Sequence, residues 1–296
     1  MDLDDLQNLK DSMDAWRPAV NRSVQSGPGA YMVVPSDQQI GKKQGAGGTD
    51  LSVARIQRGT ENAVDRLTRL RKAGLVFGTG VLALPGDHVE GNTSQGGRLQ
   101  GLAASDLGQT EQTRVARRLL LSQVKTLAPL FEHFIIPVVN GNHDDATRNV
   151  SADAADGWNV EIASSVQDII QENPAFQHVE FRYPASGHQT LAVKIDDTML
   201  GLFHGHQFTG DVRKYLSGQA VGRTSLGDCD LWVSGHYHHF KSTDIGDRLW
   251  VQAPTTDPGS DWWRDRSGDV SRPGILTVAF GNGIDPREWL GVLPVT

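Results

Sequence analysis

The amino-acid sequence predicts a mixed α/β fold whose second half is of the α+β kind. Between residues 31 and 172, short apolar segments alternate with longer segments of helical periodicity. Between residues 179 and 280, apolar segments follow one another with little helical pattern between them. The chain has 296 residues, of which 38% are hydrophobic, so it is long enough to bury a sizeable core.

Hydrophobic periodicity and turn residues place the elements in order. Leucine and methionine recur at helical spacing in the first twenty residues, and Ser, Gly and Pro are frequent just after them, so residues 1–29 are expected to form a helix and a linker. Residues 30–296 are expected to form one domain. Helices are predicted at 52–73, 110–131 and 160–172, and strands at 31–35, 81–84, 134–139, 179–183, 191–195, 199–203, 231–234, 249–252 and 275–280.

The composition excludes several classes of protein. A formal net charge of −7 excludes a dominant basic tail. One cysteine, Cys229, excludes a disulfide framework and a cysteine-rich zinc or iron–sulfur site. The acidic, polar N-terminal sequence differs from a secretory signal, and no apolar run approaches the length of a membrane span. A cytoplasmic protein without a membrane partner is therefore expected.

The histidines are clustered. Seven of the ten lie in four short polar clusters that follow predicted strands. Because the carboxyl ends of strands in α/β sheets meet at one edge, polar side chains that follow several strands are expected to converge. Carboxylate, amide and imidazole groups suit divalent Mn²⁺, Fe²⁺ or Zn²⁺, and six such groups suit two ions better than one. The six are Asp37, Asp87, Asn142, His204, His236 and His238.

Five motifs, in this order, resemble the signature of the calcineurin-like metallophosphoesterases: D-x-H, G-D-x-x, G-N-H-[DE], a lone H after a strand, and G-H-x-H. The resemblance spans residues 31–240, and a D-x-Q opening with G-D-x-x-E-G is similar to phage-type, SbcD-like nuclease members. It implies a two-sheet β sandwich flanked by helices that hydrolyses phosphate esters through a metal-bridging hydroxide. The matching segments are Asp37-Gln38-Gln39, Gly86-Asp87-His88-Val89-Glu90-Gly91, Gly141-Asn142-His143-Asp144, His204 and Gly235-His236-Tyr237-His238.

The resemblance also implies how the ligands are divided between two divalent ions. Gln39 stands where the family usually has the histidine of D-x-H. An amide oxygen is a weaker ligand, which favours Mn²⁺ or Mg²⁺ at the first ion. Mn²⁺ is the expected cofactor, with Mg²⁺, Fe²⁺ and Zn²⁺ as alternatives. The first ion would be held by Asp37, His238 and Gln39, the second by Asn142, His204 and His236, and both by Asp87.

Four more residues are candidates for the reaction itself. By the same resemblance, His143 would stabilise or protonate the leaving group, and Asp144 would orient the His143 imidazole. His204 is preferred to His206 as the ligand because it ends the predicted strand, which leaves His206 beside the ligands and near the substrate. Arg148 fits a phosphate clamp and a surface charge equally well.

The distribution of charge bears on the substrate. Residues 41–72 carry eight Lys and Arg against three acids, and residues 98–125 carry five against two. A basic rim on an acidic protein is typical of a nuclease that follows a polyanionic backbone, although ordinary solvated helix faces would give the same count. The first hypothesis is an exonuclease-like DNA nuclease, in the host cytoplasm if the chain is phage-encoded. The alternatives are a phosphomonoesterase or small-nucleotide phosphodiesterase, and a non-catalytic binding module.

Overall fold

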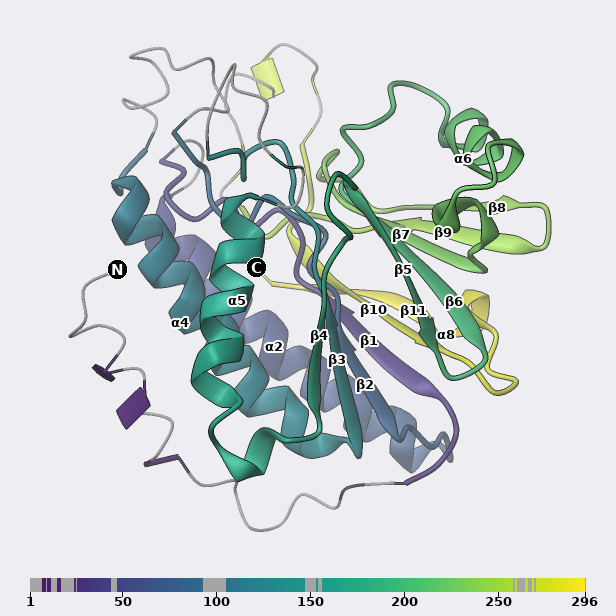
Figure 1. Cartoon of the computed structure of the whole chain (residues 1–296), viewed down its shortest axis with the longest axis horizontal. Coiled ribbons are helices and arrows are strands. Elements are labelled where there is room, and N and C mark those ends of the chain that lie inside the picture. The colour runs from purple at the N-terminus through teal and green to yellow at the C-terminus, as the bar shows by residue number, and fades with distance from the viewer. Residues whose placement is uncertain are drawn as a thin grey trace.

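Figure 1 shows the computed structural model of the chain. The structure describes residues 26–43, 47–92, 105–146, 156–257 and 270–295, together with residues 7, 8, 10, 11, 15, 16, 24, 153, 259, 264, 265 and 268. The helix and linker predicted over residues 1–29 lie mostly outside the described residues, so that prediction and the proposed domain boundary stay predictions.

In the first sheet, four neighbouring strands pair in parallel, and two further strands are added by antiparallel pairing. Parallel pairing joins β1, β2, β3 and β4, and β10 and β11 complete the order β11-β10-β1-β2-β3-β4. The register aligns Met32 with Val81, and Val81 with Ile135. The strands are β1 (Ala30–Val34), β2 (Thr79–Leu82), β3 (His133–Pro137), β4 (Val179–Arg182), β10 (Gly274–Phe280) and β11 (Leu290–Pro294).

The second sheet has five strands in the order β5-β6-β7-β9-β8. Its three central strands, β6, β7 and β9, are parallel, and an antiparallel strand lies at each edge. The strands are β5 (Thr190–Ile195), β6 (Thr198–Phe203), β7 (Leu231–Ser234), β8 (Lys241–Ile245) and β9 (Arg248–Gln252).

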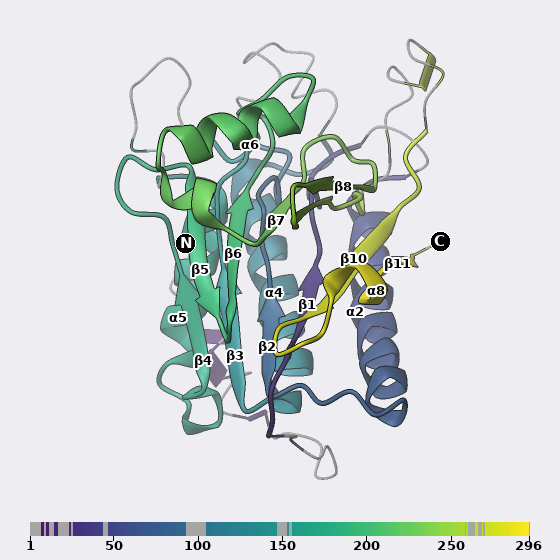
Figure 2. The ribbon, with the colours of Figure 1, turned by 90° about the vertical axis from the view of Figure 1, so that its right-hand side faces the viewer.

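Helices cover the outer faces of both sheets. Figure 1 shows α2, α4 and α5 together on the six-stranded sheet, and Figure 2 shows α6 on the other side, against the five-stranded sheet. None of the helices in the described ranges is long and apolar enough to cross a membrane. The main helices are α2 (Thr49–Lys72), α4 (Gln109–Leu127), α5 (Trp158–Ile170) and α6 (Val212–Val221), with a short α8 (Pro286–Trp289) and 3-10 turns at Ala128–Leu130, Pro174–Phe176 and Ser225–Asp228.

Strand alternation explains the layers. In β1, Met32 and Val34 face the apolar core between the two sheets, whereas Tyr31 and Val33 face the core beneath the helices. All four side chains are at most 2% exposed, as expected for a parallel strand covered on both faces. The predicted α/β fold, with two sheets flanked by helices, is confirmed, and each predicted strand has a counterpart within a few residues. The strands β8 and β11 and the helices α6 and α8 were not predicted.

Candidate metal centre

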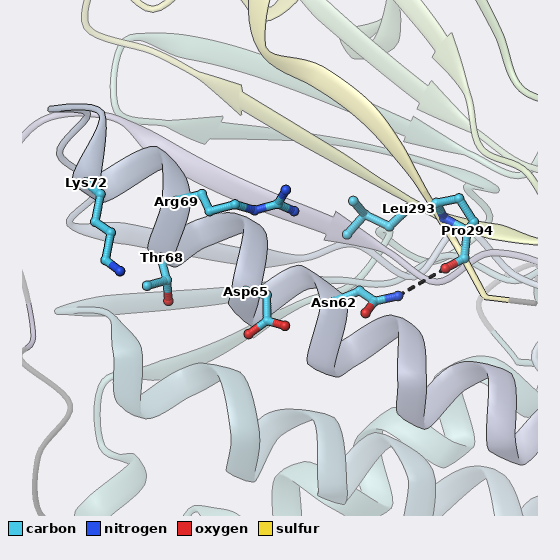
Figure 3. Close-up of a pocket in the computed structure, with 7 residues that line it drawn as sticks. All are labelled: Asn62, Asp65, Thr68, Arg69, Lys72, Leu293 and Pro294. Carbon is cyan, nitrogen blue, oxygen red and sulfur yellow. Dashed lines mark hydrogen bonds between the residues drawn. The ribbon is translucent and has the colours of Figure 1, made fainter.

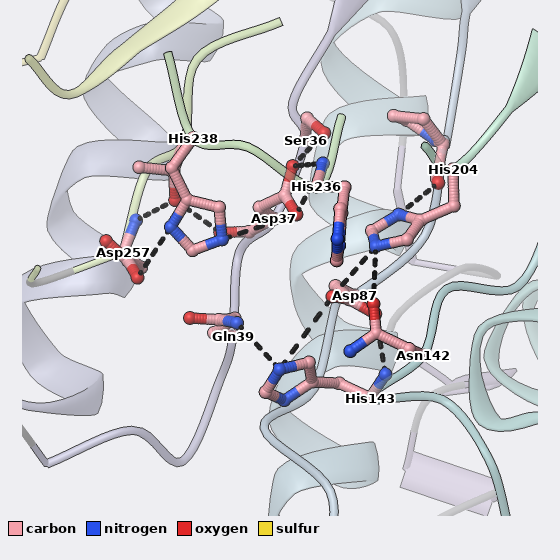
Figure 4. Close-up of polar contacts among 12 residues, drawn as sticks. Ser36, Asp37, Gln39, Asp87, Asn142, His143, His204, His236, His238 and Asp257 are labelled. Carbon is pink, nitrogen blue, oxygen red and sulfur yellow. Dashed lines mark hydrogen bonds and ion pairs between the residues drawn. The ribbon is translucent and has the colours of Figure 1, made fainter. Parts of the chain in front are cut away.

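Strand ends from both sheets meet at one place, and the residues predicted to bind metal lie there (Figure 4). A parallel bridge between Ser36 and Thr255 joins the loops that follow β1 and β9. The loops after β1, β2 and β3 and those after β6 and β7 open on the same point, as the carboxyl ends of parallel strands do. The residues brought together are Asp37, Gln39, Asp87, Asn142, His143, His204, His236 and His238.

The group predicted to hold the second ion fits a divalent cation. Asp87, His204 and His236 each offer one ligand atom, and these atoms lie within 4.8 Å of one another. His204 Nε2 lies 3.0 Å from Asp87 Oδ2 and 3.1 Å from Asn142 Oδ1. Two imidazoles, a carboxylate and an amide oxygen form a ligand set typical of Mn²⁺, Fe²⁺ or Zn²⁺.

The orientation of His204 also suits metal binding. Its Nδ1 donates to the carbonyl oxygen of Pro85 at 2.8 Å, which leaves Nε2 facing Asp87 and Asn142. Such a second hydrogen bond fixes the ring and tautomer of metal-binding histidines. Burial lowers the pKa of His204, but the Asp87 carboxylate outweighs burial and raises this pKa to about 9. A bound cation would therefore replace a proton at Nε2.

In the group predicted to hold the first ion, the His238 imidazole lies between two carboxylates. His238 Nε2 lies 3.5 Å from Asp37 Oδ1, and His238 Nδ1 lies 3.3 Å from Asp257 Oδ2. The Asp37 carboxylate also accepts hydrogen bonds from the Ser36 hydroxyl and from the His236 backbone N–H. Burial lowers the pKa of His238, whereas Asp257 and then Asp37 raise it, to about 10.

Gln39, which was predicted to bind the first ion, contacts Lys42 and His143. Its Oε1 accepts a hydrogen bond of 2.6 Å from Lys42 Nζ, and Lys42 forms a buried ion pair with Asp257. Because an ammonium group only donates, this contact fixes which end of the amide is oxygen. The other end, Nε2, lies 3.3 Å from His143 Nε2 and donates to it. Asp37, His238 and the shared Asp87 are thus the remaining ligands predicted for a first ion.

His143 lies at the more open side of the site. Its side chain is 17% exposed, whereas that of His204 is fully buried. Its Nδ1 donates to the carbonyl oxygen of Glu90 at 2.8 Å, and Glu90 Oε2 lies 3.6 Å from the same nitrogen. The backbone N–H of His143 donates to Asp87 Oδ1 at 2.8 Å. Nε2 is therefore the nitrogen that faces the site.

Asp144 supports the loops of the site. Its Oδ2 accepts hydrogen bonds of 2.7 Å from the backbone N–H groups of Asp87 and Gly141, while its Oδ1 has no hydrogen-bond partner in the described parts of the chain. The orienting contact with His143 that was expected of Asp144 comes from Glu90 instead. Burial, and then the Asp87 charge, raise the pKa of Asp144 to about 7.

The backbone of the site is strained where ligands project from it. Five of the eight non-glycine residues with positive φ among those described are site residues, with φ between 42° and 73°. Such left-handed conformations are costly for residues with a Cβ and persist where the surrounding structure imposes them. Their concentration at one point is typical of a functional site. The five are Asp37, Gln39, Asp87, His236 and His238.

Two motif glycines are needed because ligand carboxylates lie against them. A Cβ on Gly141 would overlap Asp87 Oδ1, and a Cβ on Gly235 would overlap Ser36 Oγ and Asp37 Oδ2. Interior atoms cannot interpenetrate, so a larger residue must displace the carboxylate. The G-N-H and G-H-x-H glycines thus set the positions of Asp87 and Asp37.

The other predicted residues have different outcomes. The His206 ring lies 5.4 Å from that of His204 between centroids, and its Nδ1 is buried without a partner among the described residues. The His206 ring therefore lies beside that of His204, and its predicted role near the substrate stays a prediction. His88 is buried beneath the site, and burial lowers its pKa to about 4. Arg148 lies outside the described residues.

Three residues of the site were not predicted: Lys42, Glu90 and Asp257. Asp257 follows β9, the parallel neighbour of β7, so its place after a strand was a usable signal. Lys42 and Glu90 each lie three residues beyond a predicted ligand, within the same loops. The pairing of Lys42 with Asp257 joins positions 215 apart, which no local pattern indicates.

Only part of the first basic segment lies at the site. Lys42 pairs with the Asp257 carboxylate, and the Arg55 guanidinium donates to the backbone carbonyl oxygen of Asp257. Arg69 and Lys72 instead line a surface groove between the end of α2 and β11 (Figure 3). The 24 residues of α2 span about 36 Å, so this groove lies far along the helix from the site.

No protein-family model matches this sequence, and no curated protein matches it. Similar solved structures include a zinc complex of Vps29 from Entamoeba histolytica, with 14% identity, a TM-score of 0.38 and coverage of 90% of this chain and 99% of that one. A predicted phosphoesterase from Streptococcus pneumoniae has 12% identity, a TM-score of 0.37 and coverage of 91% and 92%. An archaeal phosphodiesterase has 12% identity, a TM-score of 0.39 and coverage of 89% and 99%. Likenesses this distant carry no argument about function.

Gly141→Ala is expected to weaken Mn²⁺ binding by about tenfold or more, because the new methyl group displaces the Asp87 carboxylate. Isothermal titration calorimetry measures this change. Gly218→Ala is the matched control, because a Cβ at Gly218 meets no atom within 4 Å. Unchanged affinity in Gly141→Ala would contradict this account of the motif glycine.

Asp144→Ala is expected to lower the free energy of unfolding of the metal-free protein by about 2–5 kcal/mol, because two buried N–H donors lose their acceptor. Asp144→Asn keeps an acceptor and is expected to bind Mn²⁺ within a few-fold of wild type. Denaturant unfolding and calorimetry measure these effects.

The pH dependence provides a second check on Asp144. The pKa of Asp144 in the fold, about 7, lies above its ordinary value, so the fold favours the protonated acid. Its contribution to stability is complete below about pH 4 and is lost as the pH rises through 7. Asp144→Asn should therefore gain stability relative to wild type between pH 5 and pH 8. A constant difference would contradict the assignment.

Proposed function

We propose that this protein is a metal-dependent phosphoesterase. The observation that carries the proposal is the convergence of Asp87, Asn142, His204 and His236 on one point, with His143 beside them. The order and spacing of these residues resemble the calcineurin-like metallophosphoesterases. A divalent ion, proposed to be Mn²⁺, would supply Lewis-acid polarisation of a phosphoryl oxygen and activation of water when bound.

The residues of the chain have distinct roles in this proposal. Water attacks phosphorus, the bond from phosphorus to the leaving oxygen breaks, and that oxygen requires a proton. For this step the His143 ring carries a proton at Nε2 in place of the hydrogen bond that it accepts from Gln39, and it delivers that proton to the leaving oxygen, while the Glu90 carbonyl accepts from Nδ1 and keeps the ring in place. Asp87 accepts the backbone N–H of His143, which couples the position of the proton donor to that of the metal ligand.

For the substrate we propose a phosphodiester, with DNA as the first candidate. The excess of Lys and Arg in residues 98–125 supports a polyanionic substrate through Arg118, which is exposed, whereas Arg117 is buried. We propose a cytoplasmic location. The position of Arg69 and Lys72, far along α2 from the site, favours the alternative of a small-nucleotide phosphodiesterase or phosphomonoesterase.

His143→Ala is expected to lower Mn²⁺-dependent hydrolysis by a factor of about 10²–10⁴, the usual contribution of a general acid, with much less effect on Mn²⁺ affinity. Hydrolysis of bis-p-nitrophenyl phosphate measures the first effect, and titration calorimetry the second. His188→Ala, at an exposed histidine, is the matched control. Hydrolysis that survives in His143→Ala would contradict the role of His143, and no hydrolysis with any divalent metal would contradict the proposed function.

The substrate class is tested on the wild-type protein in parallel reactions. End-labelled single- and double-stranded DNA, bis-p-nitrophenyl phosphate and p-nitrophenyl phosphate are compared at increasing salt. Cleavage of DNA that falls steeply with salt, while small-ester hydrolysis does not, is the result expected of a nuclease. Hydrolysis of the small esters with intact DNA would assign the alternative.

A further inference from the structure

We infer that the Lys42 ammonium provides the second positive charge of this site, so that the chain binds one divalent ion where the sequence pattern suggested two. This inference rests on the proposed function and concerns its metal content. The pairing of Gln39, Lys42 and Asp257 is the observation that leads to it.

Few ligands are left for a first ion, because Gln39 is engaged by other residues. Gln39 Oε1 is held by Lys42 at 2.6 Å, and Gln39 Nε2 donates to His143 at 3.3 Å, so both ends of the amide are engaged. Asp37, His238 and the shared Asp87 remain, and His238 Nε2 lies 3.5 Å from Asp37 Oδ1. Only Asp37 and His238 belong to the first ion alone, whereas the Asp87 group has four ligands.

The charges of the buried side chains also favour one divalent ion. Lys42 Nζ and His238 Nδ1 contact the same oxygen of Asp257, so the ammonium lies directly behind His238. Lys42 and Asp257 are both buried, at 7% and 1% exposure, and a buried carboxylate requires a compensating charge. Lys42 supplies that charge. With Lys42 in place, the three buried carboxylates Asp37, Asp87 and Asp257 require two further positive charges, which one divalent ion supplies.

The Lys42 ammonium is also proposed to bind the substrate. Lys42 has three N–H donors, and Gln39 and Asp257 accept two of them. The third has no acceptor among the described residues, and in this proposal it donates to a phosphate oxygen of the substrate. A lysine binds phosphate as a point charge, which is the function that a first metal ion would otherwise serve.

The hydrogen bonds form one directed series. Lys42 donates to Gln39, Gln39 donates to His143 Nε2, and His143 Nδ1 donates to the carbonyl oxygen of Glu90. The series therefore positions the imidazole of His143 without a metal ligand in its path. Gln39 is a positioning residue in this arrangement.

The count of bound Mn²⁺ tests the inference. Wild-type protein is dialysed against MnCl₂, the bound metal is measured by atomic emission, and electron paramagnetic resonance separates isolated ions from spin-coupled pairs. The expected result is one uncoupled ion per chain. Two spin-coupled ions with intact hydrolysis would overturn the inference and leave the proposed function standing, whereas no bound ion would overturn both.

A double variant tests whether Lys42 is the reason that the chain binds one Mn²⁺ ion and not two. The double variant Gln39→His with Lys42→Ala restores a histidine ligand and removes the ammonium, so a second, coupled Mn²⁺ is expected. Lys43→Ala, at the exposed neighbouring lysine, is the matched control and should keep one ion. Gln39→His with Lys42→Met retains most of the aliphatic stem and replaces the first double variant if thermal melts show that it does not fold. A folded double variant that still binds one ion would overturn the inference.

Discussion

Three carboxylates, Asp37, Asp87 and Asp257, are buried side by side where the two sheets meet, at 0%, 1% and 1% exposure. A buried carboxylate destabilises a protein unless cationic groups and hydrogen bonds accompany it. Each has such a neighbour: His238 beside Asp37, His204 beside Asp87, and Lys42 beside Asp257. The pKa values of Asp87 and Asp257 are held below their ordinary range because these cations outweigh the effect of burial. The loops must therefore bring imidazole and ammonium groups to this point.

The fold meets this requirement through strand direction. Parallel strands of both sheets end at the same place, and the loops after β1, β2, β3, β6, β7 and β9 each supply a polar side chain. The apolar core between the sheets, with Met32, Leu202 and Val233 fully buried, fixes the separation of the two sets of loops. The left-handed backbone at Asp37, Asp87 and His238 is sustained by that packing. Stability and site geometry therefore share one cause.

Structural features that depend on a local sequence pattern could be predicted from the sequence. Apolar strands are visible as short hydrophobic runs, and the polar residues that follow them, such as Asp87 and His204, converge because of topology. The strand β8 was not recognised because its residues Lys241–Ile245 are mostly polar and lie at a sheet edge. The roles of Lys42 and Asp257 could not be derived, because their partners are distant in the sequence. A count of charges likewise could not show that Arg69 and Lys72 lie away from the site.

The position of a bound ion is the most direct test of this account. Crystals grown with Mn²⁺ would locate the metal by its anomalous scattering. The account predicts a peak within about 2.0–2.4 Å of Asp87 Oδ2, His204 Nε2, Asn142 Oδ1 and an imidazole nitrogen of His236. The absence of a peak at this group, or a fully occupied peak held by other residues, would contradict it.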